Sequence, residues 1–229
     1  MTNGSVRWAF NFAKWNPSYS DMLLAFSCVQ AEEKDRLARF DVKSSLIGRL
    51  MMRKFVSESV GEKYNEVSFI RDDKEKPLLK RKENMPTVNF NVSHQGHYTV
   101  LAGEAHDIGL GVDVMKLEYT GGKSLSEFFR LMTKHFSLEE WKTIREFDGE
   151  KQQITMFCRL WCLKESYVKA IGVGITINTK RLSKDYIVKD TELYVRGEKL
   201  DWVFEEMLLD DDHCVAVALN RNRNYSDTF

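Results

Sequence analysis

The chain carries no excess of charge of either sign. Lysine and arginine together number 34, as do aspartate and glutamate, so the formal net charge at neutral pH is zero. A protein with this balance has no global field that attracts nucleic acid or a membrane surface, and we expect it to bind neither. Any phosphate-binding site must therefore come from local clusters of basic residues.

Long apolar runs and paired cysteine motifs are also missing. No apolar stretch reaches the length of a membrane-spanning helix, and the first residues lack the basic-then-apolar pattern of a signal peptide. The four cysteines form no CxxC pair, which favours free thiols in a reducing compartment, so we expect the cytosol. Cys158 and Cys162 could share a metal on a helix, but no histidine stands at the spacing of a zinc finger.

Two common nucleotide-binding signatures are absent. The sequence contains neither GxxxxGK followed by Ser or Thr nor GxGxxG after a predicted strand, which argues against a P-loop ATPase and a Rossmann dinucleotide site. What the chain does contain is an ordinary globular composition, with 43% hydrophobic and 30% charged residues over a length of 229. That length suits one large or two small domains.

Apolar periodicity predicts the elements of the first half. Alternation over 6–12 predicts a strand, and we interpret the apolar run 22–29 as a second strand. An i, i+3/i+4 stripe predicts a helix over 44–61 that ends at Gly61, after a shorter helix over 32–40. A short strand, a basic loop and three closely spaced strands over 87–93, 97–103 and 108–114 follow.

The second half repeats this order of elements. A linker with Gly121-Gly122 leads to a helix over 136–147, which Ser137 and Glu140 open as a capping box, and then to a long helix over 152–171. Strands over 191–208 and 213–220 follow. We therefore predict an α+β fold of two similar half-domains, 1–115 and 116–220, and a polar, disordered tail over 221–229. Whether the likeness reflects duplication or coincidence stays open, but two such halves create a cleft for a ligand.

The stretch 159–174 places three chemistry-bearing residues on one helical face. Trp161, Glu165 and Lys169 are spaced i, i+4 and i+8. Glu165 and Lys169 could be an ordinary helical ion pair. Asp113, at the end of a predicted apolar strand, could be a cap or an ion-pair partner, or a ligand for a hard cation together with Glu165.

Two further stretches suit phosphate. Ser93 and His94 lie at a strand end before a glycine turn, where a hydroxyl, a backbone N–H and an imidazole can meet phosphate oxygens. His94 and His97 could also bind a metal, although the spacing is weak evidence. Three cations precede Pro77 within six residues, and they repel one another unless an anion joins them. These cations are Arg71, Lys74 and Lys76.

The motifs GVDVMK (111–116) and WCLKESYVKAIG (161–172) resemble the paired signature of the Sfp-type 4′-phosphopantetheinyl transferases, G-I/V-D and W-x-x-K-E-S/A-x-x-K. NVSHQGHYTVLA and the KEKP loop also fit, and the resemblance covers about 6–219 and is closest to animal members of the family. It implies a pseudo-twofold pair of α+β halves that hold coenzyme A and Mg²⁺ in the cleft between them.

The resemblance also implies roles for residues. Asp113 and Glu165 would hold the metal and, with Lys169, form the catalytic set. Residues implied in coenzyme A binding are Arg36, Arg71, Lys74, Lys76, Asn91, Val92, Ser93, His94 and Lys169. Two departures matter: Met115 stands where many members have a third acidic residue, so a water may complete the metal shell, and Glu75 replaces the glycine of a G-K-P loop.

The implied activity is Mg²⁺-dependent transfer of 4′-phosphopantetheine from coenzyme A to a serine of an apo carrier protein, with release of adenosine 3′,5′-bisphosphate. The implied partners are acyl carrier protein domains such as those of fatty acid synthase and aminoadipate-semialdehyde dehydrogenase-like proteins, and the enzyme would be a monomer. Arg49, Arg53 and Lys54 could dock an acidic carrier or form a solvated face. A non-catalytic coenzyme A-binding protein and an interaction scaffold remain as alternatives.

Overall fold

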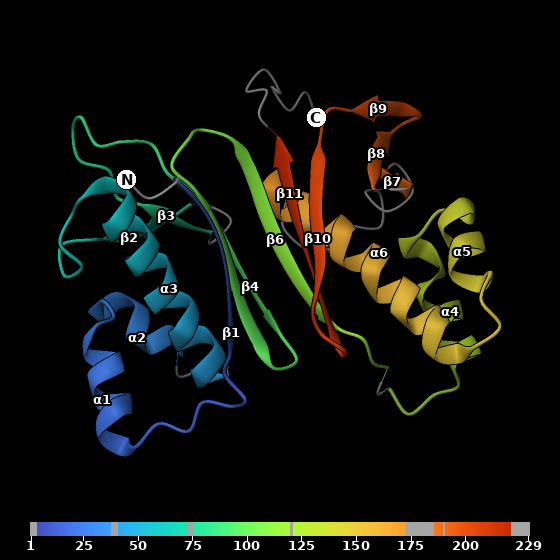
Figure 1. The fold of residues 1–229 in the computed structure, drawn as a ribbon, viewed down its shortest axis with the longest axis horizontal. Coiled ribbons are helices and arrows are strands. Elements are labelled where there is room, and N and C mark those ends of the chain that lie inside the picture. The colour runs from blue at the N-terminus through green and yellow to red at the C-terminus, as the bar shows by residue number, and fades with distance from the viewer. Residues whose placement is uncertain are drawn as a thin grey trace.

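The computed structural model describes residues 4–37, 41–72, 76–119, 121–172, 186–189 and 191–220. The fold is α+β, with two three-stranded antiparallel sheets side by side and one long helix against each (Figure 1). Two further sheets with shorter strands, one of two strands and one of three, lie at the periphery. No helix in these ranges is long and apolar enough to cross a membrane.

The elements follow one another in two runs. The first run is β1 (Ser5–Asn11), α1 (Tyr19–Ser27), α2 (Ala31–Leu37), α3 (Val42–Val60), β2 (Phe69–Arg71), β3 (Pro77–Leu79), β4 (Asn89–Gln95), β5 (Tyr98–Glu104) and β6 (Gly109–Lys116). The second run is α4 (Leu125–Met132), a short 3-10 helix (Thr133–His135), α5 (Leu138–Arg145), α6 (Glu150–Ala170), β7 (Tyr186–Lys189), β8 (Glu192–Val195), β9 (Glu198–Leu200), β10 (Val203–Asp210) and β11 (His213–Asn220).

The first sheet has the strand order β1-β5-β4, and α3 packs against it. The buried side chains of α3 meet those of the sheet in one apolar cluster, which includes Met52, Phe55, Val56, Phe90 and Leu101. The helix begins at the side chain of Asp41 and ends at Gly61, which has a φ of 75°. The predicted helix over 44–61 and its glycine cap are therefore confirmed.

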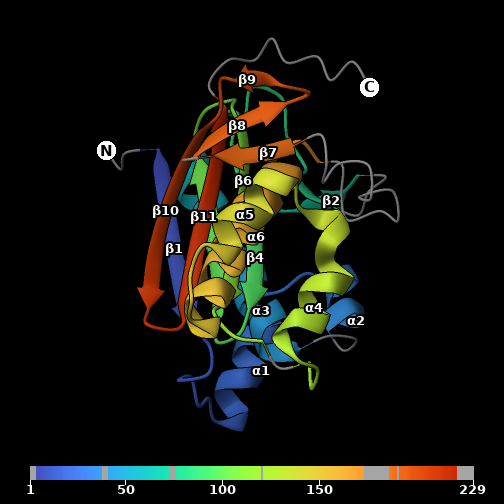
Figure 2. The ribbon, with the colours of Figure 1, turned by 90° about the vertical axis from the view of Figure 1, so that its right-hand side faces the viewer.

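The second sheet has the order β10-β11-β6, and α6 crosses it. Figure 2 shows α4, α5 and α6 together on this face of the sheet. Gly111 of β6 allows the close approach of α6, because a Cβ there would lie 2.1 Å from the carbonyl oxygen of Ser166 and 2.4 Å from the nitrogen of Ala170. The glycine of the G-V-D motif therefore brings the helix within reach of the neighbouring aspartate.

The two sheets share an apolar core. Side chains of β5 meet one face of β6 and of β11, in a cluster that comprises Val100, Ala102, Leu110, Val112, Val114, Val215, Val217 and Leu219. Residues alternate between the faces of a strand, so the other face of β6, with Gly111, Asp113 and Met115, turns toward α6. One face of β6 therefore packs in the core between the two sheets, and the other face lies against α6.

The prediction of a second strand over 22–29 is wrong, because this run lies largely in α1. Ser18 and Asp21 form a complete capping box at the start of that helix, a local signal that outweighs the apolar run. None of the residues of α1 is buried, so the run is not a core strand.

The two long helices end alike. α3 is followed by Gly61 and α6 by Gly172, whose φ values are 75° and 68°. Together with the two sheets this confirms the predicted α+β fold, whereas the division into two half-domains stays a prediction. The boundary between 115 and 116 stays a prediction, because β6 pairs with β11 but also contacts β4 and β5. The tail over 221–229 lies outside the described residues.

Candidate active site

Three elements meet at the ammonium group of Lys169. Its Nζ lies 2.6 Å from Oδ1 of Asp113 on β6 and 2.7 Å from Oγ of Ser93 on β4. The hydroxyl of Ser93 donates to the same Asp113 oxygen at 2.8 Å. Residues from both halves of the chain therefore form one compact polar cluster, which we call the Asp113 cluster.

The sequence suggested two arrangements that the structure does not have. Lys169 pairs with Asp113, 56 residues away, and forms no ion pair with Glu165 one helical turn before it in the part of the chain that the structure describes. Asp113 lies in the middle of β6, opposite Ala216 of β11, and not at a strand end. It is 6% exposed, so the ammonium and hydroxyl compensate a carboxylate that is nearly buried.

Glu165 is the member of the site with a raised pKa. Burial and, next, the negative charge of Asp113 raise its pKa, and the positive charge of Lys169 partly opposes them, so that the pKa lies at about 7. Within the described ranges, no hydrogen bond or ion pair of Glu165 stabilises its charged form. A carboxyl group with a pKa near neutrality and no donor is suited to accept a cation or a proton.

The residues present fit a divalent cation, although no group of three His, Cys, Asp or Glu side chains is found in the described part of the chain. Asp113 already binds a cation, the ammonium of Lys169, and Glu165 raises the negative charge beside it. Mg²⁺ typically takes one or two carboxylates and completes its shell with water and phosphate. Met115 belongs to the apolar side chains packed around α6 and offers no oxygen ligand.

Val92 and His94 differ from Ser93, because neither side chain belongs to the Asp113 cluster. Val92 packs against the apolar cluster under α3, and a Cβ on Gly48 would lie 3.1 Å from it. His94 lies toward solvent; partial burial and, next, the charge of Lys169 lower its pKa, while Asp41 opposes them. At neutral pH the imidazole is therefore neutral, and it can donate one hydrogen bond and accept another.

The predicted basic residues are only partly brought together. Lys76 Nζ lies 3.5 Å from the carbonyl oxygen of Lys169, so the basic loop reaches the end of α6. Arg71 binds Glu33 at 3.2 Å, and Glu33, which is nearly buried, also binds Arg49 at 2.8 Å. Sequence reasoning missed Glu33, which lies within a charged helix and gives no signal of its own.

Three of the basic residues need separate comment. Lys74 lies outside the described residues, as does the side chain of Arg36 in α2. Arg53 is 3% exposed and donates to the carbonyl oxygens of Tyr64 and Val67, so it can neither dock a carrier nor belong to a solvated face. Its guanidinium instead fixes the chain that follows α3.

Asn91 binds within the protein. Its Oδ1 accepts the backbone N–H of Val112 at 3.0 Å, so it joins β4 to β6 beside the Asp113 cluster. It is 9% exposed. This bond was not expected from the sequence, because it links two strands that share no backbone ladder.

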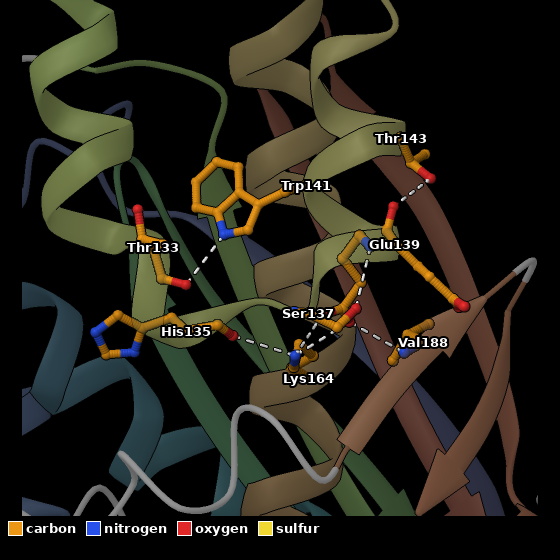
Figure 3. A network of polar contacts seen from close by, with 9 residues as sticks. Thr133, His135, Ser137, Glu139, Trp141, Thr143, Lys164 and Val188 are labelled. Atoms are coloured by element: carbon orange, nitrogen blue, oxygen red, sulfur yellow. Dashed lines mark hydrogen bonds and ion pairs between the residues drawn. The ribbon is translucent and has the colours of Figure 1, made fainter. Parts of the chain in front are cut away.

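A second lysine of α6 forms a different cluster, which we call the Glu140 cluster. Lys164 lies among His135, Ser137 and Val188 (Figure 3) and donates to the carboxylate of Glu140 at 3.0 and 2.8 Å. Glu140 also accepts the backbone N–H groups of Ser137 at 2.7 Å and Val188 at 3.1 Å. Burial lowers the pKa of Lys164, and the attraction of Glu140 opposes this.

The predicted capping box of Ser137 and Glu140 is thus confirmed, but its carboxylate does more than cap a helix. It is fully enclosed and joins α5, α6 and β7. The carboxylate of Glu140 accepts from two backbone N–H groups and one ammonium, so we expect this cluster to stabilise the fold. Of the two lysines in the W-x-x-K-E-S-x-x-K motif, only Lys169 faces the Asp113 cluster.

Two family models match the chain in succession. The model described as "4′-phosphopantetheinyl transferase, N-terminal" matches residues 13–106, and the model described as "4′-phosphopantetheinyl transferase superfamily" matches residues 109–218. The second match includes Asp113, Glu165 and Lys169. The first includes Ser93 and the basic loop before Pro77.

Curated relatives extend this similarity over nearly the whole chain. The L-aminoadipate-semialdehyde dehydrogenase-phosphopantetheinyl transferase of Xenopus laevis is 42% identical over 231 residues, which is 94% of this chain and 76% of the relative. Its human counterpart is 42% identical over 232 residues, 94% of this chain and 75% of the relative. A phosphopantetheinyl transferase of Thraustochytrium sp. is 34% identical over 230 residues, with 94% and 78% covered.

Proposed function

We propose that this chain, which belongs to the 4′-phosphopantetheinyl transferase superfamily, uses the Asp113 cluster for its transfer chemistry. The resemblance that the motifs predicted is confirmed, including its animal branch. The protein is an enzyme that transfers 4′-phosphopantetheine to carrier proteins. The observation that supports its site is the meeting of Lys169, Asp113 and Ser93 from three elements.

The donor in this proposal is coenzyme A. A serine hydroxyl of the carrier attacks the phosphorus that bears pantetheine, a new P–O bond forms, and the diphosphate P–O bond breaks to release adenosine 3′,5′-bisphosphate. The nucleophile belongs to the partner, which explains why the site contains a base and cations but needs no nucleophile of its own. Such transfer depends mostly on positioning and on stabilising negative charge.

Asp113 and Glu165 would hold Mg²⁺, which when bound neutralises negative charge on the diphosphate. Lys169 would place its ammonium against the leaving phosphate. Its Nζ already lies within 2.7 Å of Ser93 Oγ and Asp113 Oδ1, the groups proposed to meet phosphate and metal. The hydroxyl of Ser93 would release Asp113 and donate to a phosphate oxygen. His94, neutral at physiological pH, would donate a further hydrogen bond.

Glu165 is the proposed general base for the carrier serine. Its pKa of about 7 in the metal-free protein lies close to the pH at which a base works best. Glu165 would take the proton of the serine hydroxyl either directly or through a water molecule. Both routes use a carboxyl group for which no hydrogen-bond donor is found among the described residues.

The nucleotide end of coenzyme A would lie toward the basic residues of the first half. Lys76 contacts the end of α6, and Arg71 on β2 pairs with Pro77 next to it, which supports a place for both beside a ligand that starts at Lys169. We propose that Arg36, Lys74, Asn91 and Val92 contribute to the same ligand site. Arg71 would have to share its guanidinium between Glu33 and the ligand.

We propose acyl carrier protein domains as acceptors, including those of fatty acid synthase and of a protein like aminoadipate-semialdehyde dehydrogenase, which the names of the animal relatives mention. We further propose that the enzyme is monomeric, binds neither nucleic acid nor membranes, and works in the cytosol. The four cysteines are free, as expected in a reducing compartment.

One experiment tests this function. The protein is incubated with Mg²⁺, coenzyme A and an apo acyl carrier protein, and the mass of the carrier is followed. We expect the carrier to gain one phosphopantetheine group with wild-type protein, whereas Asp113→Ala should leave it unmodified. Asp211→Ala, an exposed aspartate in the turn between β10 and β11, serves as the matched control. A wild-type protein that binds coenzyme A but never modifies the carrier would show a non-catalytic binding protein.

A further inference from the structure

One nearly buried carboxylate of the first half binds two arginines from different elements. Oε1 of Glu33 on α2 lies 2.8 Å from Nε of Arg49 on α3, and it accepts a hydrogen bond from Arg71 on β2 at 3.2 Å. Glu33 is 6% exposed, whereas the side chains of Arg49 and Arg71 are 18% and 20% exposed. We call these three residues the Glu33 cluster.

The segment that carries Glu33 is fixed to β2 at two points. Directly before α2, the side-chain oxygen of Gln30 accepts the backbone N–H of Phe69 at 2.8 Å and an N–H of Arg53 at 3.3 Å. Three residues further along the chain, Glu33 binds Arg71 at the other end of β2. The position of the carboxylate relative to β2 is therefore set by more than its own ion pairs.

The Glu33 cluster carries an excess of positive charge. Two guanidinium groups and one carboxylate leave one net positive charge in a place that is partly open to solvent. The two cations repel each other, and the carboxylate between them lowers the cost of keeping them together. Two arginines held in this way suit a phosphate monoester, which carries close to two negative charges at neutral pH.

Arg71 connects the Glu33 cluster to the end of α6. It pairs with Pro77 in the ladder between β2 and β3, and Lys76 directly precedes that proline. The Nζ of Lys76 lies 3.5 Å from the carbonyl oxygen of Lys169. In the proposed function the diphosphate of coenzyme A lies at Lys169, so its nucleotide would extend along this hairpin toward Arg71.

Arg49 connects the same cluster to β4. The pKa of His94 is lowered by burial first and then by the charge of Lys169, while Asp41 opposes them. Arg49 lowers this pKa further, so its guanidinium lies within electrostatic range of the imidazole. The Glu33 cluster therefore adjoins both the basic hairpin and the end of β4 that we propose for phosphate.

We propose that Glu33 is a positioning residue for the nucleotide end of coenzyme A, because it holds Arg49 and Arg71 together where they bind the phosphate monoester on the ribose. Glu33 itself is negative and nearly buried, and it does not touch this phosphate. The inference rests on the proposed function for the identity of the ligand. It assigns a role to a carboxylate that, by its charge alone, would weaken the binding of an anion.

The sign of the effect separates positioning from simple neutralisation. Glu33→Gln keeps the shape of the side chain and one carbonyl oxygen but removes the negative charge. If Glu33 only cancels positive charge, its loss makes the region more positive, and anions bind more tightly. If Glu33 holds the two arginines in place, they separate when its charge is lost, and the monoester binds less tightly.

The probes are adenosine 3′,5′-bisphosphate and adenosine 5′-monophosphate, which differ by the monoester alone. Calorimetry measures the Kd of both, and their ratio refers to the same folded molecules, so partial unfolding does not change it. We expect Glu33→Gln to lower the preference for the bisphosphate about tenfold, because charge-assisted contacts to the monoester are lost. Arg49→Met should lower it as well. Glu32→Gln, at an exposed neighbour on α2, should keep the wild-type preference.

Carrier modification gives a second readout. Glu33→Gln should raise KM for coenzyme A about tenfold and leave kcat nearly unchanged, because the monoester is not the reacting group. With dephospho-coenzyme A, which lacks the monoester, Glu33→Gln and wild type should have equal KM. A purely structural role of Glu33 would instead lower the amount of active protein, and with it the rate for both donors.

An unchanged preference in Glu33→Gln, or tighter binding of the bisphosphate, would overturn the inference. A loss of kcat at unchanged KM would do the same, as would a wild-type protein with equal affinity for the two nucleotides. A wild-type protein that prefers the bisphosphate but modifies no carrier would contradict the proposed function instead, and the calorimetric comparison would still decide on Glu33.

Discussion

Helix α6 carries two lysines whose carboxylate partners lie on other elements, and the two pairs differ in their surroundings. Lys164 pairs with Glu140 and Lys169 with Asp113, and five residues of helix rotate the two lysines by about 140°. The Lys164 and Glu140 side chains are 11% and 1% exposed, whereas Lys169 is 27% exposed. The first pair is thus closed to solvent, and the second is partly open to it.

The two clusters differ in how many hydrogen-bond donors surround their carboxylates. Glu140 is enclosed by three donors, two backbone N–H groups and one ammonium. At the other cluster one ammonium serves Asp113, while Glu165 beside it has a raised pKa and no donor within the described ranges. A satisfied buried pair stabilises a fold, whereas an excess of carboxylate marks a place for a cation or a proton.

The largest effect is expected from Glu165→Gln. The change keeps the shape of the side chain but removes both the base and a carboxylate ligand, so transfer should fall by about 10⁴-fold or more. The rate is measured by mass spectrometry of the carrier, and circular dichroism should show an unchanged fold. A variant within tenfold of wild type would remove Glu165 from the mechanism.

The same substitution in the other cluster should destabilise the protein. Glu140→Gln leaves the ammonium of Lys164 buried without its counter-charge, and we expect the free energy of unfolding to fall by about 3–5 kcal/mol. Urea denaturation measures this, and Glu139→Gln, an exposed neighbour on α5, is the control. If both variants unfold at the same urea concentration, the Glu140 cluster is not structural.

The two lysines should separate activity from stability. Lys169→Met should slow transfer about 10²-fold at saturating Mg²⁺, because one cation at the leaving phosphate is lost. Lys164→Met should instead lower the free energy of unfolding while the folded fraction keeps its rate. Urea denaturation curves and initial rates for both variants check this. Equal effects of the two variants on the transfer rate and on the free energy of unfolding would contradict it.

The smallest effect is a pH dependence of stability in the metal-free protein. The pKa of Glu165 is raised from 4.5 to about 7 by folding, so its contribution is complete below pH 4.5 and is lost as the pH rises through 7. With a chelator present, Glu165→Gln should match wild type at low pH and exceed it by about 1–3 kcal/mol at pH 8. Equal stabilities of the two proteins across this pH range would show that folding does not raise the pKa of Glu165.

Much of the fold follows from local patterns. The stripe over 44–61 with Gly61 and the capping box of Ser137 and Glu140 depend on neighbours within a few residues, and both are confirmed. The run over 22–29 failed because its apolar residues fit a strand or a helix equally well. The capping box at Ser18 and Asp21 was the signal that could have decided between them.

The sequence by itself determined the family and the residues of the Asp113 cluster, because motif residues stand at fixed positions whatever surrounds them. Only the tertiary structure decided their partners. Lys169 takes Asp113 across 56 residues, and Lys164 takes Glu140 across 24, although each lysine has a carboxylate nearby on its own helix. The reason is burial: an enclosed carboxylate binds the nearest donor that packing supplies, and packing joins residues that the sequence keeps far apart.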